Sequence, residues 1–495
     1  HAVLDELGNT VLYGHPDAQA IFTRIQVEND SLLILRNTVE GERPVGFASY
    51  REIGNDELYG VLKDMELANL VRGKSSREIL LITGIYARED GTGDSGVIRD
   101  APQQLLVEVL AKELEKNYSF ALFVAERGTA TKEVVYVLER QGFIRPHMAD
   151  ENDKRTIYMV DMHEPLMFLH NLDTTIKEPF ASNPAVLDAV EKNHKKLQIA
   201  MTKLYPGNLV LSLSSGIMYH RLVDRITALN DVPREPLVPR RLGKNMCVPF
   251  GKILRGKVVP NTVTKTLHTD KVYEPDLNSF TIEPFPYYSP LKSQIETIKS
   301  FDRPVILVDD LVHTANRLQV LVPQLREDGI PIKKVVVGVL SGYGRDLMQC
   351  LKVPVESIYS MPNLRQWFVE STLYPFIGGD TVRREEMKVA GLQPSINMIL
   401  PYATPRLSGC SREALVEFSA CCIENSRDLF QVLEAEYRKM YAKNLTLSRL
   451  SEAVILPLCP DKGSCMEYDE NLAASVYLEN DLETLWRMKE FLIKG

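Results

Sequence analysis

Two adjacent aspartates, Asp309 and Asp310, close an apolar run in the stretch RPVILVDDLVHTANRL, residues 303–318. A carboxylate only accepts hydrogen bonds, so an adjacent pair suits either a metal ion or two neighbouring hydroxyl groups. The turn that follows offers successive backbone N–H groups, the Thr314 hydroxyl and a helix start, which together favour an anion. Two acids that can bind neighbouring hydroxyls, next to a turn that can bind phosphate, indicate a binding site for a sugar phosphate. The alternative is a buried strand that ends in solvated acids.

This stretch resembles the ribose-phosphate loop of type I phosphoribosyltransferases, with its apolar strand, paired acids, two apolar residues and small hydroxyl-rich turn. The resemblance implies that the two aspartates face the ribose hydroxyls and act in catalysis. It also implies that the turn holds the 5′-phosphate through Thr314, Ala315, Asn316 and Arg317. His313 departs from the pattern, because the family usually has a small or hydroxyl residue there. Its imidazole would either crowd the phosphate or donate to it.

Three further segments are expected to complete this site. In the family an earlier loop cradles pyrophosphate, and Ser214, Ser215 and Gly216 match it in form, although a plain capped turn fits equally well. A charged segment follows that would neutralise the departing pyrophosphate, or would simply be a solvated hairpin. Its cations are Arg255, Lys257, Lys265, His268 and Lys271, of which Lys265 and His268 are assigned catalytic roles. Downstream, Trp367 and Phe368 would stack on a flat acceptor or pack in a core.

A second resemblance lies nearer the N-terminus, in EILLITGIYAREDGTGDSG and the later TKEVVYVLERQGF. These stretches resemble the core of GNAT-type N-acetyltransferases. Arg88, Gly91 and Gly93 reproduce the R-x-x-G-x-G spacing, whose amides would hold the pyrophosphate of acetyl-coenzyme A. Two departures count against activity: the predicted helix begins late, near Pro102, and Leu138 stands where many members have a thiolate-protonating tyrosine. A degenerate domain used for docking is the alternative.

The elements that must position these residues predict an α/β protein of two domains. Residues 1–162 mix strand-like runs with two helical stretches, which predicts a GNAT-like mixed sheet, and 163–207 form a helical connector. From 208 to 395, continuous apolar strands alternate with helices, which predicts a buried parallel sheet of phosphoribosyltransferase type. Residues 396–495 read as a helical C-terminal cap.

Composition narrows the class of protein. A formal net charge of −8 over 495 residues argues against nucleic acid as the main partner. Neither a long apolar run nor a signal-like leader stands out, so we expect a cytoplasmic protein that does not bind membranes. Seven cysteines at irregular spacing fit a reducing compartment. Cys421 and Cys422 are expected to be buried, and Cys459 with Cys465 lack a second ligand pair, so no metal-ligating residue is assigned.

Three functions remain after this reading. The preferred one is a phosphoribosyltransferase that takes phosphoribosyl pyrophosphate (PRPP) with Mg²⁺ and transfers the phosphoribosyl group to a nitrogenous acceptor. The second is a non-catalytic sensor or scaffold for nucleotides or PRPP, which His313 and Leu138 favour. The third is an N-acetyltransferase dependent on acetyl-CoA. The expected partners are small molecules, a homodimer is left open, and the acceptor cannot be read because acceptor contacts come from variable loops.

Overall fold

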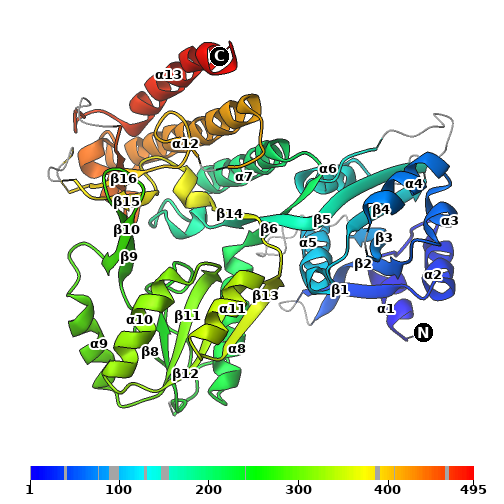
Figure 1. Cartoon of the computed structure of the whole chain (residues 1–495), viewed down its shortest axis with the longest axis horizontal. Helices are drawn as coiled ribbons and strands as arrows, with labels where there is room; N and C mark the ends of the chain where they lie inside the picture. The colour runs from blue at the N-terminus through cyan, green and yellow to red at the C-terminus, as the bar shows by residue number, and fades with distance from the viewer. Residues whose placement is uncertain are drawn as a thin grey trace. The chain divides into compact units, whose positions relative to one another are not determined.

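The computed structural model describes residues 2–37, 42–75, 77–88, 100–126, 131–146, 155–239, 241–384, 389, 391–405, 407–462 and 468–494. Its contacts divide the chain into two compact units. The first unit comprises His1–Met167, Tyr205–Ser212 and Met361–Gln366, and the second comprises the remainder of the chain (Figure 1). The chain therefore returns twice to the first unit after leaving it.

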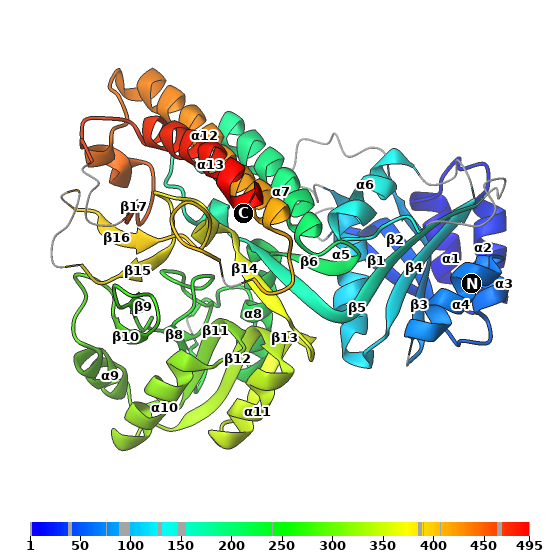
Figure 2. The same cartoon turned by 45° about the horizontal axis from the view of Figure 1, so that its top comes forward.

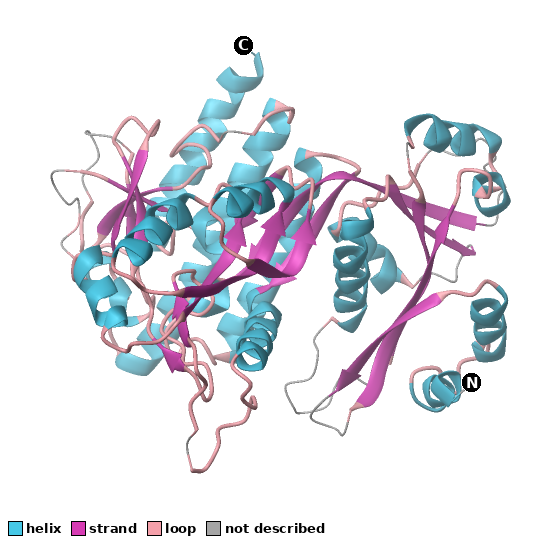
Figure 3. Cartoon of the chain, turned by 60° about the horizontal axis from the view of Figure 1, so that its bottom comes forward, coloured by secondary structure: helices cyan, strands magenta, loops and turns pink. Residues whose placement is uncertain are grey.

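A mixed sheet forms the centre of the first unit, with strand order β1-β2-β3-β4-β5-β14 and β6 also paired to β5; β14 is Gln366–Val369. From β1 to β5, neighbouring strands are antiparallel except for β3 and β4, which pair in parallel over Leu80–Ile82. Helices lie on both sides of this sheet (Figure 3). The strands are β1 (Ser31–Asn37), β2 (Arg43–Ile53), β3 (Ile79–Ala87), β4 (Phe120–Glu126), β5 (Arg155–His170) and β6 (Asn208–Ser214). The helices are α1 (Ala2–Thr10), α2 (Ala18–Val27), α3 (Leu58–Leu62), α4 (Met65–Lys74), α5 (Ala101–Glu113) and α6 (Lys132–Arg140).

The first helices and strands follow from local signals in the sequence. Asp64 caps α4 by accepting from Leu67 N at 2.9 Å, and Thr131 caps α6 by accepting from Val134 N at 3.2 Å. On β2, Phe47 packs with α1 and α2, whereas the backbone of Gly46 meets Leu105 of α5 on the other face. Alternate residues of one strand therefore serve two layers of helices.

The second unit contains a parallel sheet in the order β13-β12-β11-β7-β8. β11 runs parallel to both β12 and β7, and β7 runs parallel to β8. Val305, Leu307 and Val312 of β11 are buried with residues of helix α10, and Ile306 and Val308 are buried as well, as expected for a parallel sheet covered on both faces. Its elements are β7 (Met246–Pro249), β8 (Val263–Thr264), α9 (Leu291–Lys299), β11 (Val305–Val312), α10 (Asn316–Glu327), β12 (Ile332–Ser341), α11 (Gly342–Cys350) and β13 (Val355–Met361).

The rest of the second unit is a smaller sheet and a group of long helices. The smaller sheet has the order β10-β9-β15-β16-β17. Helix α12 packs against α7 and α13, and the three lie side by side (Figure 2). The remaining elements are α7 (Pro184–Leu204), α8 (Ser215–Leu229), β9 (Thr269–Tyr273), β10 (Phe280–Pro284), β14 (Gln366–Val369), β15 (Asp380–Val382), β16 (Gln393–Ile396), α12 (Arg412–Tyr441), β17 (Leu458–Pro460) and α13 (Ala474–Lys494).

The predicted fold class is confirmed: a mixed sheet lies in the N-terminal region, a parallel sheet follows, and the C-terminal end is mainly helical. In the part of the chain that the structure describes, we find no helix whose length and apolar character would let it cross a membrane. On α12, Cys422 is buried as expected, whereas Cys421 is only partly buried; Cys465 lies outside the described residues.

Candidate functional site

The acid pair lies where the parallel sheet changes its direction of winding. In chain order the strands run β7, β8, β11, β12 and β13, so the chain moves outward to β8 on one side and to β13 on the other. The switch point falls between β7 and β11. Loops that leave the carboxyl ends of such strands diverge, and ligands of open α/β sheets bind in the crevice between them. Asp309 and Asp310 lie on β11 next to this crevice.

The turn after β7 lies directly against Asp310. The two oxygens of Asp310 accept from the backbone N–H of Lys252 at 2.7 Å and of Ile253 at 3.1 Å. Gly251 makes this approach possible, because a Cβ at that position would overlap Asp310 and come within 2.8 Å of Asp309 Oδ1. The backbone turn therefore holds Asp310 in place and lies close to Asp309.

Asp309 is the more buried acid of the pair, with 9% of its surface exposed. Its Oδ1 accepts from Asp310 N at 2.8 Å and lies 3.8 Å from Arg317 Nη1. Burial raises the pKa of Asp309 to about 7, although the Arg317 charge opposes this. The side chain therefore exchanges its proton near neutral pH, and a cation or hydroxyl ligand would favour its ionised form.

Cationic side chains gather around the acid pair. Burial lowers the pKa values of Lys252 and Arg255, and the charge of Arg317 lowers both further, so the three lie within electrostatic reach of one another. The acids Asp270 and Asp380 partly balance them. Such a cluster suits the several negative charges of a phosphorylated ligand.

The turn after β11 combines strain with side-chain contacts. Ala315 has a φ of 50°, in the left-handed region that costs a residue with a Cβ some energy, and it immediately precedes α10. Thr314 Oγ1 accepts from Asn316 Nδ2 at 2.8 Å, and Arg317 Nη1 donates to Phe250 O at 3.3 Å. A left-handed residue at a helix start directs successive N–H groups toward one point, which is the arrangement of an anion-binding nest.

His313 is held by Ser341, its Nδ1 lying 2.8 Å from Ser341 Oγ. Ser341 Oγ also accepts from Gly344 N at 3.0 Å, so the two hydrogen bonds fix the position of the hydroxyl beside the imidazole. Burial lowers the pKa of His313 and so favours the neutral ring. The ring centroid of Trp367 lies 4.9 Å away, whereas Phe368 is buried beside Phe418.

The strand that leads to Ser214, Ser215 and Gly216 is not part of the sheet that carries the acid pair. They begin α8, after strand β6, which pairs with β5. Ser214 caps the helix by accepting from Ile217 N at 3.5 Å, and Ser215 Oγ donates to Asp173 Oδ1 at 3.3 Å. In this structure the turn that touches the acids is the one after β7.

The predicted cations between the loops mostly lie on aromatic rings. Arg255 lies over Phe285 at 4.6 Å and Lys257 over Tyr219 at 4.2 Å. Lys271 contacts the rings of Tyr273 and Phe280, and the His268 ring stacks on Tyr288 with centroids 3.8 Å apart. Burial, Arg255 and Lys265 lower the pKa of His268, so its ring favours the neutral form. Burial lowers the pKa of Arg255 and the negative charge of Asp310 opposes this, so this cation lies close to the acid pair.

The predicted coenzyme site of the first unit is described only in part. Gly91 and Gly93 lie outside the described residues, and Arg88 N donates to Val45 O at 3.0 Å. Helix α5 begins at Ala101, as expected from Pro102. Leu138 is fully buried on α6.

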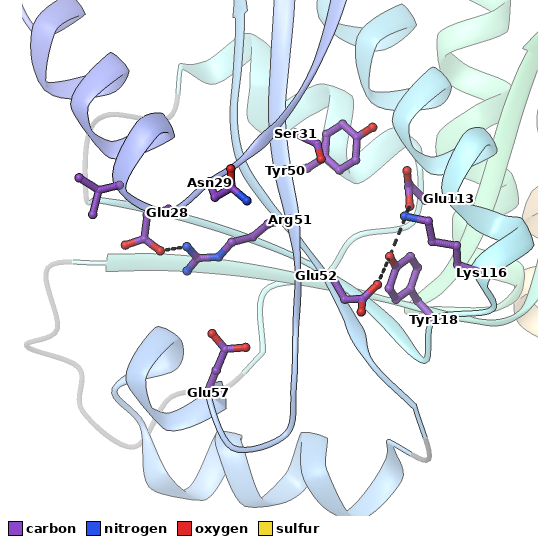
Figure 4. Close-up of a pocket in the computed structure, with 11 residues that line it drawn as sticks. Glu28, Asn29, Ser31, Tyr50, Arg51, Glu52, Glu57, Glu113, Lys116 and Tyr118 are labelled. Atoms are coloured by element: carbon purple, nitrogen blue, oxygen red, sulfur yellow. Dashed lines mark hydrogen bonds and ion pairs between the residues drawn. The ribbon is translucent and has the colours of Figure 1, made fainter.

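A cavity of about 440 Å³, lined by several glutamates, lies near the C-terminal end of β2 (Figure 4). One of its lining residues is Glu52, which pairs with Leu80 near the start of β3. The last residue of β3, Ala87, pairs instead with Gly46 near the start of β2. Tyr118 OH donates to Glu52 Oε2 at 2.7 Å. The other lining residues are Val27, Glu28, Asn29, Ser31, Tyr50, Arg51, Glu57, Glu113 and Lys116. The cavity therefore lies near the start of β3, away from Ala87 at its end.

Several residues of the acid-pair site were missed in the sequence. Gly251 and Lys252 follow the short apolar run MCVPF, and the dipeptide Gly-Lys after that run was the available signal. Asp270 and Asp380 are more than a hundred residues apart and carry no local pattern.

The chain was compared with protein families, curated proteins and solved structures. No family model and no curated protein matches the chain. A purine phosphoribosyltransferase from Pyrococcus horikoshii is 14% identical, covers 31% of this chain and 87% of its own, and has a TM-score of 0.21. An acetyltransferase of the GNAT family from Listeria monocytogenes is 18% identical, with coverages of 32% and 81% and a TM-score of 0.20. The NatC complex bound to Gag peptide and CoA is 11% identical, with coverages of 29% and 79% and a TM-score of 0.20.

Acetyltransferases recur among these similar structures more often than phosphoribosyltransferases. Likenesses with TM-scores this low carry no argument about function. What the chain does must be argued from its own residues.

Proposed function

We propose that the second unit binds PRPP with Mg²⁺ at the carboxyl end of β11 and transfers the phosphoribosyl group to a nitrogenous acceptor. One observation carries this proposal: the acid pair lies at the switch point of a parallel sheet with the turn at Gly251–Ile253 against it. In the reaction the bond from ribose C1 to pyrophosphate breaks while a bond from C1 to the acceptor nitrogen forms.

Each group at the switch point has a role in this reaction. The ribose hydroxyls donate to Asp309 and to the remaining lone pairs of Asp310. The turn at His313–Arg317 receives the 5′-phosphate. Lys252 and Arg255 stabilise the pyrophosphate as its negative charge grows, which lowers the barrier because the groups are already oriented.

The donor set of this site fits magnesium. Mg²⁺ prefers oxygen ligands and usually binds through one or two carboxylates together with phosphate oxygens. Asp309 and Asp310 are the residues that would hold it, directly or through the ribose hydroxyls. When bound, the ion would neutralise the pyrophosphate charge.

Calorimetry with PRPP and Mg²⁺ tests the proposal directly. We expect binding by the native chain, loss of binding in Asp309→Asn, and unchanged binding in Asp346→Asn, an exposed acid on α11 that serves as the matched control. Absence of binding to the folded native chain would overturn the assignment. Binding without turnover across a panel of nitrogenous bases would favour a sensor.

A second candidate is an N-acetyltransferase activity of the first unit that uses acetyl-CoA. Its support is the way in which two parallel strands separate. β3 pairs with β4 only over Leu80–Ile82, although β3 continues to Ala87 and β4 continues to Glu126. Backbone groups beyond such a ladder can pair with an extended ligand. Acetyl-CoA should raise the melting temperature of the native chain and of Gly73→Leu, which alters an exposed helix position, but not of Gly91→Leu. An equal rise in all three would place the coenzyme elsewhere.

A further inference from the structure

Three side chains from distant segments of the second unit meet at one buried point. His170 ends β5, His194 lies in the middle of α7, and Glu370 begins the short 3-10 helix Glu370–Leu373. His170 Nδ1 and His194 Nδ1 are 3.1 Å apart, and His194 Nδ1 is 2.5 Å from Glu370 Oε1. The three side chains can place one nitrogen or oxygen each within 4.8 Å of the others. None of them belongs to the acid-pair site.

Hydrogen bonds alone cannot satisfy this arrangement. The single Nδ1 position of His194 faces both the carboxylate and the Nδ1 of His170. If it carries a proton, that one proton faces both Glu370 Oε1 and His170 Nδ1 and cannot make a full hydrogen bond to each. If it carries no proton, its lone pair faces the negative carboxylate. Each protonation state leaves at least one close contact poorly satisfied.

Glu370 adds an independent observation. The side chain is fully buried, and its Oε2 has no hydrogen-bond partner among the described residues, lying 3.8 Å from His170 Nδ1. That distance is too long for a hydrogen bond. A fully buried carboxylate with an unused oxygen can accept a cation.

The outer contacts of the cluster are those that orient a ligating histidine. Gln198 lies one helical turn after His194 on α7, and its side-chain amide is 2.9 Å from His170 Nε2. The atoms in contact are two nitrogens, Gln198 Nε2 and His170 Nε2, so in this orientation the amide donates to the imidazole. A metal at His170 Nδ1 requires the reverse orientation of the amide, in which its oxygen accepts the Nε2 proton and the Nδ1 lone pair is directed at the cluster.

We propose that His170, His194 and Glu370 form a binding site for a zinc-class divalent cation, with a fourth coordination position open to water or a substrate atom. Two imidazole nitrogens and one carboxylate oxygen are ligands that Zn²⁺ takes at 2.0–2.2 Å, which places tetrahedral ligand atoms roughly 3.3 Å apart. The observed 3.1 Å fits this spacing, and the His194–Glu370 contact opens by less than about 1 Å on binding. Three protein ligands with an open fourth position are typical of catalytic zinc.

The two histidines are the partly exposed members of the cluster. The His170 and His194 side chains are 12% and 22% exposed, whereas Glu370 is covered completely. A cation at this point would be neutralised by the buried carboxylate. This geometry favours nitrogen-binding transition metals over Mg²⁺ or Ca²⁺, which prefer sites made of oxygen.

Cobalt and zinc binding by the full chain test the proposal. After removal of bound metals with a chelator, Co²⁺ should bind at one equivalent and give the intense visible absorption of a tetrahedral site, and Zn²⁺ should displace it. His194→Gln should abolish that spectrum. His220→Gln, which alters an exposed histidine beside Arg234, should leave it unchanged. Gln198→Ala should weaken Zn²⁺ affinity by about 10–100-fold, since it removes an outer contact only.

Two results would overturn the metal site. One is a folded native chain that binds no Co²⁺ or Zn²⁺. The other is binding that His194→Gln and Glu370→Gln leave unchanged. If these variants fail to fold, X-ray absorption of the Zn²⁺-loaded native chain decides: a first shell of nitrogen and oxygen with two imidazoles supports the site, and any shell containing sulfur refutes it.

Discussion

Asp309 makes the stability of the second unit depend on pH in a defined direction. Its folded pKa of about 7 exceeds the ordinary value of 3.8, so between these values the folded chain holds a proton that the unfolded chain releases. Its contribution to stability is therefore present at low pH and is lost as the pH rises toward 7.

Asp309→Asn should remove this dependence, because asparagine resembles the protonated acid. We expect the variant to exceed the native chain in free energy of unfolding at pH 8 by on the order of a few kcal/mol, and to differ little at pH 4. Urea denaturation at both pH values measures this. Parallel pH profiles for the native chain and the variant would show that Asp309 is ionised throughout.

At the scale of residues, the sequence predicts site residues that are neighbours in the chain and misses those that come from distant segments. Asp309, Asp310 and the following turn could be found because they are neighbours in the chain. His170, His194 and Glu370 span two hundred residues, and no spacing rule connects them. Lys252 contributes its backbone N–H to Asp310, a role that any residue type could fill and that sequence therefore does not record.

At the scale of elements, the turn at Gly251 determines whether the acids can lie together. Gly251→Ala would push a methyl group into both carboxylates. We expect PRPP binding to be lost and the free energy of unfolding to fall by about 1–3 kcal/mol, as for an overpacked site. Calorimetry and urea denaturation check both effects.

Gly73→Ala is the control for this prediction, because a Cβ there meets no atom and alanine favours a helix. It should leave binding unchanged and stability equal or slightly higher. If Gly251→Ala binds PRPP as the native chain does, the turn after β7 has no part in the site.

The helices and strands themselves were predicted better than the pairing of the strands in the sheets. The apolar runs at β6, β11 and β12 and the long helix α12 were recognised as a strand or helix, because periodicity and capping are local properties. β6 was expected in the parallel sheet, but it pairs with β5, and the four-residue β7 takes the place beside β11. A short apolar run fits any sheet, and its partner is chosen by packing over long distances in the chain.

At the scale of the whole molecule, the first unit is completed by segments that come after the second unit has begun. Asp161 N donates to Gly207 O at 2.7 Å, and Val210 N donates to Gln141 O at 3.1 Å. Gln141 is fully buried, and Gly142, with a φ of 92°, leaves no room for a Cβ against Asn208 O. β6 therefore covers an edge and buried polar groups that residues 1–167 cannot satisfy alone.

A fragment of residues 1–167 should consequently melt at a lower temperature than the same fragment mixed with a peptide of residues 203–214. The peptide supplies the edge strand and the N–H donors for Gln141. A matched peptide with Val210→Pro should stabilise much less, because proline removes the N–H that donates to Gln141 O. Circular dichroism melting of the three samples measures the difference. Equal melting temperatures would mean that β6 is a passive edge and that the first unit is complete by Met167.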